Sequence, residues 1–287
     1  GVTTIGHSAF YGCEKLSSVK LPNSLTTIEG FAFSGCNGLT ITIPDNVESM
    51  SMLTFSDCTG LDITIPGRFL TKIENPIGSN CKDVRVTIAE GTYDITSVGD
   101  AIKGRDSLFI SSGTFTIVAG GDGLQSTNEE EEGKGILTIE SGTFTITAAA
   151  DGIQAATNLQ ILGGDFTITT GGGSANSSTT SEAWGTWGAP TEEAATTTTE
   201  ETTSAKGLKA TGSLAISGGT FVLDTSDDAL HTNDTIQITG GDFTIASGDD
   251  GIHADNTVTI DDGTIDINQS YEGIEATEIT LNGGDIT

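Results

Sequence analysis

Three stretches of the chain decide its fold: SDDALHT at 226–232, SGDDGIHA at 247–254 and QSYEGIEA at 269–276. Their acidic residues Asp228, Asp250 and Glu272 follow one another at a constant spacing of 22 residues. A fixed period of this size is typical of a solenoid, in which each repeat contacts only its neighbours. Earlier copies are DAIKG at 100–104, DGLQS at 122–126, DGIQA at 151–155 and KGLKA at 206–210.

Each repeat contains three short segments in which apolar and polar residues alternate. This alternation predicts half-buried strands, and Gly-rich segments such as ITGGDF at 238–243 predict the turns between them. Three strands in a coil of about 22 residues predict an all-β fold, the parallel β-helix. A row of equivalent apolar residues should line its core: Phe115, Phe144, Phe166, Phe221, Phe243 and then Ile265.

Residues 1–90 carry a second pattern with nearly the same period. It is clearest in AFYGCEKLSSVKLP at 9–22 and AFSGCNGLTITIP at 32–44. This pattern resembles the BspA-type leucine-rich repeat of bacterial surface proteins. Its cysteines, which lack the close pairs that a zinc site needs, are predicted to form a row of small buried thiols: Cys13, Cys36, Cys58 and Cys81.

The composition narrows the function classes. The formal net charge is −29, with 40 acidic and 11 basic residues. Nucleic acids and anionic membrane surfaces attract basic faces, so neither is an expected partner. No apolar run is long enough to span a bilayer, so membrane insertion is not expected either. The chain begins and ends inside repeats, and we interpret it as a piece of a longer, processed or truncated protein.

The two patterns divide the chain into a leucine-rich part at 1–90 and a β-helical part at 91–287. Because their periods match, we expect one continuous right-handed solenoid across the join near Thr87–Asp94. The second part is interrupted by a Gly/Ser/Thr-rich insertion at 171–204, which contains both tryptophans, Trp184 and Trp187. Their rings either stack on sugars or pin the insertion onto the coils, and both readings stay open.

The stretches SAKGLKA, SDDALHT, SGDDGIHA and YEGIEATEITLNGGDI resemble the clostridial-type carbohydrate-binding β-helix family, whose architecture is that of polysaccharide lyases. The resemblance extends over about 86–287 and includes the Trp-bearing insertion. It implies a right-handed parallel β-helix, bound Ca²⁺ and binding of plant cell-wall polysaccharides such as cellulose and pectate. It also implies a secreted protein or one on the bacterial cell surface.

Acidic residues of successive coils should lie about 4.8 Å apart, the distance between neighbouring strands. Carboxylates at that distance repel one another unless a cation neutralises them, and Ca²⁺ prefers oxygen ligands. A calcium site is therefore predicted at Asp227, Asp228, Asp249 and Asp250, with Glu272 beside it. The alternative is a run of solvated turn aspartates, each capping local N–H groups.

A second polar row lies three residues further along in each copy: Lys103, Gln125, Gln154, Lys209, His231, His253 and Glu275. These side chains could form hydrogen bonds with sugar hydroxyls or carboxylates. The predicted carbohydrate-binding residues are the last four of this row, together with Trp184 and Trp187. Ordinary solvent-facing polarity is the alternative.

Three functions compete. The first is a non-catalytic, calcium-dependent polysaccharide-binding protein of the cell surface, with a role in adhesion. The second is a calcium-dependent pectate lyase, in which Lys206 or Lys209 is the base that removes the proton next to the uronate carboxylate. No arginine lies near the acidic row to assist that reaction, so we favour binding. The third is a structural or adhesive solenoid, whose open ends allow end-to-end self-association.

Overall fold

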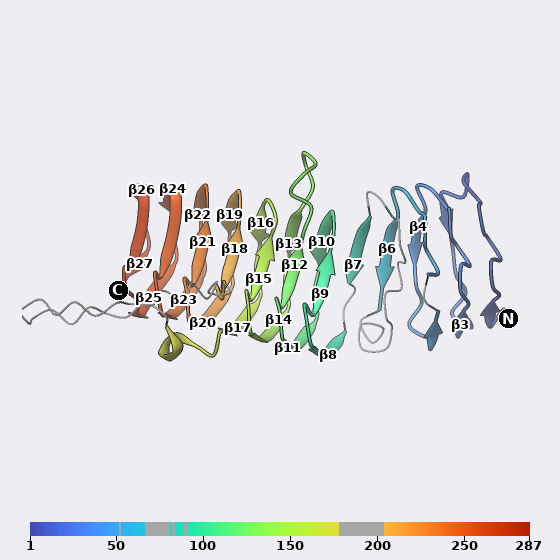
Figure 1. The fold of residues 1–287 in the computed structure, drawn as a ribbon, viewed down its shortest axis with the longest axis horizontal. Helices are drawn as coiled ribbons and strands as arrows, with labels where there is room; N and C mark the ends of the chain where they lie inside the picture. The colour runs from blue at the N-terminus through green and yellow to red at the C-terminus, as the bar shows by residue number, and fades with distance from the viewer. Residues whose placement is uncertain (52, 67–80, 82–83, 89–90, 178–203) are drawn as a thin grey trace, which may run out of the picture.

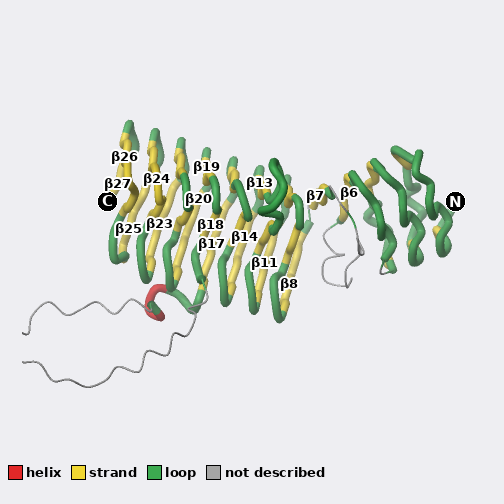
Figure 2. Tube along the Cα trace, turned by 45° about the horizontal axis from the view of Figure 1, so that its top comes forward, coloured by secondary structure: helices red, strands yellow, loops and turns green. Residues whose placement is uncertain are grey.

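The computed structural model describes residues 1–51, 53–66, 81, 84–88, 91–177 and 204–287. They form coils of short parallel strands stacked along one long axis, with the two termini at opposite ends (Figure 1). Among the described residues the only helical element is a single 3₁₀ turn, η2 (Ser174–Asn176), drawn red in Figure 2. The predicted all-β solenoid of about 22-residue coils, with leucine-rich repeats at its N-terminal end, is confirmed.

The leucine-rich part begins with a three-stranded parallel sheet of two-residue strands: β1 (Thr4–Ile5), β3 (Thr27–Ile28) and β5 (Ser49–Met50). The rings of Phe10 and Phe33 stack with centroids 5.1 Å apart, and those of Phe33 and Phe55 at 5.5 Å. The thiols of Cys36 and Cys58 are buried beside them, and each donates to a phenylalanine carbonyl oxygen of the preceding coil. Burial raises the pKa of the Cys58 thiol to about 11, so it stays protonated and unreactive.

One parallel sheet continues from the leucine-rich part into the β-helix. Its strands along this side are β2 (Ser18–Val19), β4 (Thr40–Thr42), β6 (Asp62–Ile65), β7 (Arg85–Ile88), β10 (Ser107–Ile110), β13 (Ile136–Ile139), β16 (Leu159–Ile161), β19 (Ser213–Ile216), β22 (Thr235–Ile238) and β24 (Ile252–Ile260). At the join, Ile63 pairs with Val86, which pairs with Leu108. Strand pairing is thus continuous there, as the matched periods predict. The described buried apolar residues nevertheless form two clusters, one ending at Ile65 and the other beginning at Tyr93.

A second sheet of eight strands forms another side of the β-helix: β8 (Thr92–Ser97), β11 (Thr114–Ala119), β14 (Thr143–Ala148), β17 (Asp165–Thr170), β20 (Thr220–Thr225), β23 (Asp242–Ser247), β25 (Thr264–Gln269) and β27 (Asp285–Ile286). It carries the predicted phenylalanine row, which Tyr93 extends by one coil. Successive rings from Tyr93 to Phe243 stack with centroids 4.3, 4.7, 4.8, 4.8 and 4.5 Å apart. Each turn into this sheet uses a glycine such as Gly241, whose φ of 117° disfavours other residues.

The third side, which we call the ladder face, carries the acidic motifs. Its strands are β9 (Ile102–Gly104), β12 (Leu124–Ser126), β15 (Ile153–Ala155), β18 (Leu208–Ala210), β21 (Leu230–Thr232) and the first residues of β24 and β26 (Ile274–Leu281). In each three-residue strand the outer two residues are buried and the central one is not. The central positions therefore form a row that solvent can reach, between residues that are buried.

Candidate functional site

Two positions before each strand of the ladder face lies one residue of what we call the aspartate row: Asp100, Asp122, Asp151, Lys206, Asp228, Asp250 and Glu272. The turn after the acid is tight: a Cβ added at Gly251 would meet the carbonyl oxygen of Gly273 at 2.6 Å. Four of the aspartates are buried, with Asp151, Asp228, Asp250 and Asp122 exposed by only 2, 3, 4 and 6 %. They differ in this from a run of solvated turn aspartates.

One oxygen of each buried aspartate accepts a hydrogen bond from the backbone of the next coil. The N–H of Asp151 donates to Oδ1 of Asp122 at 2.9 Å, and the N–H of Lys206 donates to Oδ1 of Asp151 at 2.8 Å. Beyond Lys206 the same contact joins Asp250 to Asp228 at 3.0 Å and Glu272 to Asp250 at 3.1 Å. The carboxylates thus connect neighbouring coils through hydrogen bonds to an ionised acceptor, which are stronger than neutral ones.

The other oxygen accepts from the central residue of a ladder-face strand. We call the central residues of all seven strands the donor row, although Gln154 accepts from Gln125 and Glu275 is itself an acid: Lys103, Gln125, Gln154, Lys209, His231, His253 and Glu275. Lys103 donates to Oδ2 of Asp100 at 3.0 Å, and Lys209 to Oδ2 of Asp151 at 2.9 Å. Nδ1 of His231 lies 2.8 Å from Oδ2 of Asp228. Lys103 and Lys209 therefore neutralise one aspartate each, and His231 contacts another, a use that the sequence interpretation missed.

Lys206 replaces the acid at its own position and links two coils instead. Its ammonium group donates to Asp227 at 2.8 Å and to Asp228 at 2.7 Å. Burial alone lowers the pKa of Lys206, but the charge of Asp228 and the hydrogen bonds to both aspartates outweigh it, so its pKa is raised. Burial likewise raises the pKa of Asp228, yet the contacts from His231 and Lys206 outweigh burial and bring it down to about 2.

The surroundings of Asp122 raise its pKa, whereas those of Asp228 lower the pKa of that residue. Burial, followed by the charge of the neighbouring Asp151, raises the pKa of Asp122 to about 6. Its Oδ2 accepts from the amide of Gln125, which also donates to Gln154 at 2.9 Å. The side-chain carbonyl oxygen Oε1 of Gln125 is buried and accepts no hydrogen bond from the described residues. Among them it is one of two buried side-chain nitrogen or oxygen atoms without a partner.

The structure brings three of the predicted calcium ligands together. Carboxylate oxygens of Asp227, Asp228 and Asp249 lie within 4.8 Å of one another. Burial and then the charges of Asp228, Asp250 and Asp227 raise the pKa of Asp249, a sign of excess negative charge. This set of oxygen ligands fits Ca²⁺, because one ammonium group, that of Lys206, stands against three carboxylates and leaves the cluster acidic. The other two predicted ligands are not part of this group. The oxygens of Asp250 accept from the backbone N–H of Glu272 and contact His253, and Glu272 is exposed.

The predicted carbohydrate-binding residues lie in two places. Lys209, His231, His253 and Glu275 are consecutive members of the donor row and pair with one another in register. Trp184 and Trp187 lie outside the described residues. Sequence reasoning also missed a groove of about 430 Å³ over the Gly-rich turns before the eight-stranded sheet, whose signal is the repeated GGD or DDG motif. It is lined by Gly240, Gly241, Asp242, Asp262, Gly263, Thr264, Gly284 and Asp285.

Comparison with known families identifies both parts. Residues 71–251, which include most of the ladder face, match the family described as carbohydrate-binding domain-containing protein. The chain belongs to this family. Residues 1–101 match the BspA type leucine rich repeat region in six copies.

The two matches and the fold together support a carbohydrate-binding or adhesion role for this carbohydrate-binding domain family member. Repeats of the BspA type are typical of bacterial surface proteins. No curated protein and no solved structure matches the chain. Among the described residues, no helix has the length and apolar character that crossing a membrane requires.

Proposed function

We propose that this chain is an extracellular, non-catalytic polysaccharide-binding protein of the bacterial surface, and that it binds acidic plant cell-wall polymers through calcium. The observation that carries the proposal is the donor row, which presents one partly accessible polar side chain per coil over seven coils in register. Coils repeat at about 4.8 Å, a distance close to the length of one sugar unit. An extended polysaccharide lying along the solenoid axis therefore meets an equivalent polar contact at each sugar.

Calcium enters the proposal for an electrostatic reason. With a net charge of −29, the chain repels a polymer such as polygalacturonate, in which every sugar carries a carboxylate. A cation held by Asp227, Asp228 and Asp249 converts part of that repulsion into attraction, because it offers remaining coordination positions to a uronate carboxylate. Neutral cellulose needs no such bridge, and the aromatic rings of Trp184 and Trp187 suit stacking on its sugars.

The contacts of the two lysines favour binding over lyase chemistry. A base that removes a carbon-bound proton must be neutral when substrate arrives. Lys206 donates to two aspartates and has a raised pKa, so it is protonated at neutral pH. Lys209 donates to Asp151 at 2.9 Å and to the Ser204 hydroxyl at 3.1 Å. Both ammonium groups thus act as fixed cations within the acidic row.

Calorimetric titration with polygalacturonate and with cellulose oligomers, each with and without chelator, tests the proposal. We expect polygalacturonate to bind only with calcium and cellulose oligomers to bind in both conditions. Asp249→Asn should weaken the first interaction alone, whereas replacing both tryptophans by alanine should weaken mainly the second. Lys20→Gln, an exposed change on the leucine-rich part, is the matched control.

Two outcomes would assign a different function. Growth of unsaturated, ultraviolet-absorbing product from pectate during long incubation, abolished by Lys206→Ala or Lys209→Ala, identifies a lyase. Absence of binding to either polymer in every condition identifies a structural or adhesive solenoid.

A further inference from the structure

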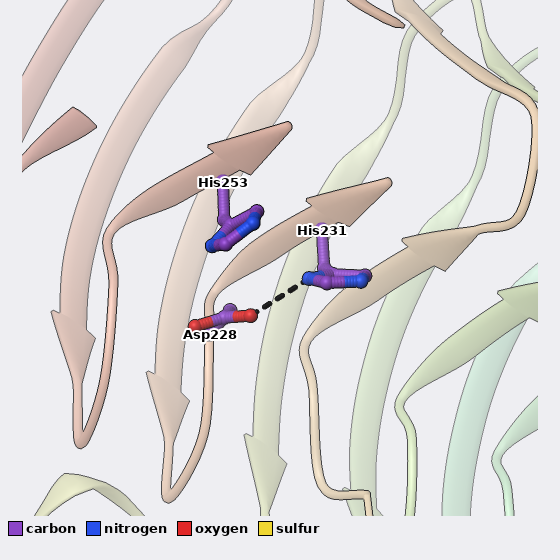
Figure 3. Close-up of side chains that lie close together, drawn as sticks. All are labelled: Asp228, His231 and His253. Carbon is purple, nitrogen blue, oxygen red and sulfur yellow. Dashed lines mark hydrogen bonds and ion pairs between the residues drawn. The ribbon is translucent and has the colours of Figure 1, made fainter. Parts of the chain in front are cut away.

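Two of the three histidines of the chain lie side by side at the end of the donor row. His231 is the centre of β21, and His253 is its Cα partner in β24. Their ring centroids are 5.0 Å apart, with planes tilted by 36°. Figure 3 shows both imidazoles projecting from neighbouring strands above the carboxylate of Asp228. Because both strands belong to one continuous sheet, the Cα positions of the two histidines are fixed relative to each other.

A buried carboxylate orients each ring. Nδ1 of His231 lies 2.8 Å from Oδ2 of Asp228, and Nδ1 of His253 lies 3.0 Å from Oδ2 of Asp250. A carboxylate beside a ring nitrogen favours a cation between the two atoms, either a proton or a metal ion that replaces it.

The donor atoms meet the distance requirement of a metal site. One atom each from Asp228, His231 and His253 lie within 4.8 Å of one another, and Asp250, His253 and Glu275 form a second such group. Zinc–nitrogen bonds of about 2.0–2.1 Å require a closer approach than that, and rotation of the partly accessible rings about their side-chain bonds supplies it. Glu275 lies 3.2 Å from Nδ1 of His253.

We propose that His231 and His253, with a carboxylate oxygen of Asp228, bind one divalent transition-metal ion of the zinc class. Imidazole nitrogens select Zn²⁺, Ni²⁺ and Cu²⁺, whereas Ca²⁺ takes six to eight oxygens. The ion differs for this reason from the calcium proposed beside it, which depends on Asp227 and Asp249. Asp228 belongs to both sets of ligands, so the two proposed ions share one carboxylate.

The site has room for further ligands. The side chains of His231 and His253 are 14 and 24 % exposed, so the ion lies at the surface of the ladder face. Three protein ligands leave a fourth tetrahedral position to water, which is the pattern of zinc sites that bind exogenous ligands. The ion therefore adds an anion-binding position to the donor row. The proposal stands on the histidine geometry alone and does not depend on calcium or on the polymer.

The test is titration of the tag-free, chelator-treated full chain with Zn²⁺ alone, followed by calorimetry, and with Co²⁺ alone, followed by visible absorption. We expect one zinc equivalent per chain and Co²⁺ bands typical of four-coordinate nitrogen and oxygen ligation. His231→Gln and His253→Gln should each weaken zinc binding by about 100-fold or more, since each removes a direct ligand. His7→Gln, which changes the third histidine, should leave it unchanged. Thermal unfolding of each metal-free variant checks that it is folded.

A further variant separates this proposal from the proposed function. Asp227→Asn should retain zinc binding and lose calcium binding, while the two histidine variants should do the reverse. The proposal is overturned if the chain binds no zinc at micromolar concentration. It is also overturned if zinc binding is unchanged in the His231→Gln/His253→Gln double variant, because general attraction to the acidic surface then explains the binding.

Discussion

The backbone N–H of Asp250 donates a 3.0 Å hydrogen bond to Oδ1 of Asp228, the equivalent residue of the preceding coil. Oδ2 of the same carboxylate accepts from Lys206 and contacts His231. Lys206 occupies the position equivalent to Asp228 in the preceding coil, and His231 belongs to the donor row. The contact shows why a buried acid recurs in each coil: it is an acceptor that joins one coil to the next.

The first prediction concerns that connection. Asp228→Ala should lower the free energy of unfolding by about 3–5 kcal/mol, because it leaves the Lys206 ammonium and the Asp250 N–H without their buried acceptor. Asp228→Asn should cost less, since its Oδ1 still accepts from Asp250. Denaturant unfolding measures both, and the exposed Asp242→Ala should change stability by no more than about 0.5 kcal/mol. Equal effects of the alanine and asparagine variants would show that the backbone contact contributes nothing.

The second prediction concerns the aromatic row. Phe166 stacks between Phe144 and Phe221, with centroids 4.8 Å away on both sides. Phe166→Ala should therefore lower the free energy of unfolding by about 3–5 kcal/mol, through lost burial and the cavity that remains. The matched control is Val222→Thr, on the outer face of the next coil, where the residue is 45 % exposed. A loss from the control as large as that from Phe166→Ala would contradict the assignment of the row to the core.

The third prediction concerns pH. The pKa of Asp122 is about 6 in the folded protein against an ordinary value of 3.8. Between these values the folded state binds more protons than the unfolded state, so stability falls as pH rises from about 4 to about 6. Asp122→Asn has no proton to lose and should be more stable than the parent chain at pH 7, by about 2 kcal/mol. Gln125 can turn its unpartnered Oε1 toward the new amide.

The measurement is the unfolding midpoint of Asp122→Asn against the parent chain from pH 3.5 to 8. The advantage of the variant should shrink toward pH 4 and vanish below it, where Asp122 becomes protonated in both states. Asp94→Asn, at an exposed position, is the control and should follow the parent chain throughout. An advantage that is the same at every pH would mean that the charge of Asp122 is not its cause.

Most of the fold could be predicted because its signals are periodic. The spacing of Asp228, Asp250 and Glu272 determined the coil, and the alternation within each coil determined the strands. The phenylalanine row followed from the same register. Tyr93 was missed as its first member because the row was traced through phenylalanines alone, although GTYDI at 91–95 lies 22 residues before GTFTI at 113–117.

The candidate site was harder to predict because its chemistry depends on which groups meet. The sequence placed acids one strand apart, and repulsion between them suggested a metal ion. It did not reveal that Asp151 accepts from the Lys206 N–H and from the Lys209 ammonium, because these contacts cross from one coil to the next. A repeated pattern of Asp followed three residues later by Lys, Gln or His was the available signal. Only the three-dimensional arrangement distinguishes a donor that faces solvent from one that faces a buried carboxylate.

The last prediction locates the calcium site by charge. The ammonium group of Lys206 lies 2.8 Å from Asp227 and 2.7 Å from Asp228, so it competes with any cation held by these carboxylates. Lys206→Gln should therefore tighten calcium binding, by about tenfold if the removed repulsion is near 1.4 kcal/mol. Asp249→Asn should weaken it, and Lys20→Gln, on the leucine-rich part, should leave it unchanged. Calorimetric titration of calcium into chelator-treated protein measures all three. If Lys206→Gln leaves the affinity as it was, calcium is held elsewhere on the chain, and the acidic cluster is neutralised by Lys206 alone.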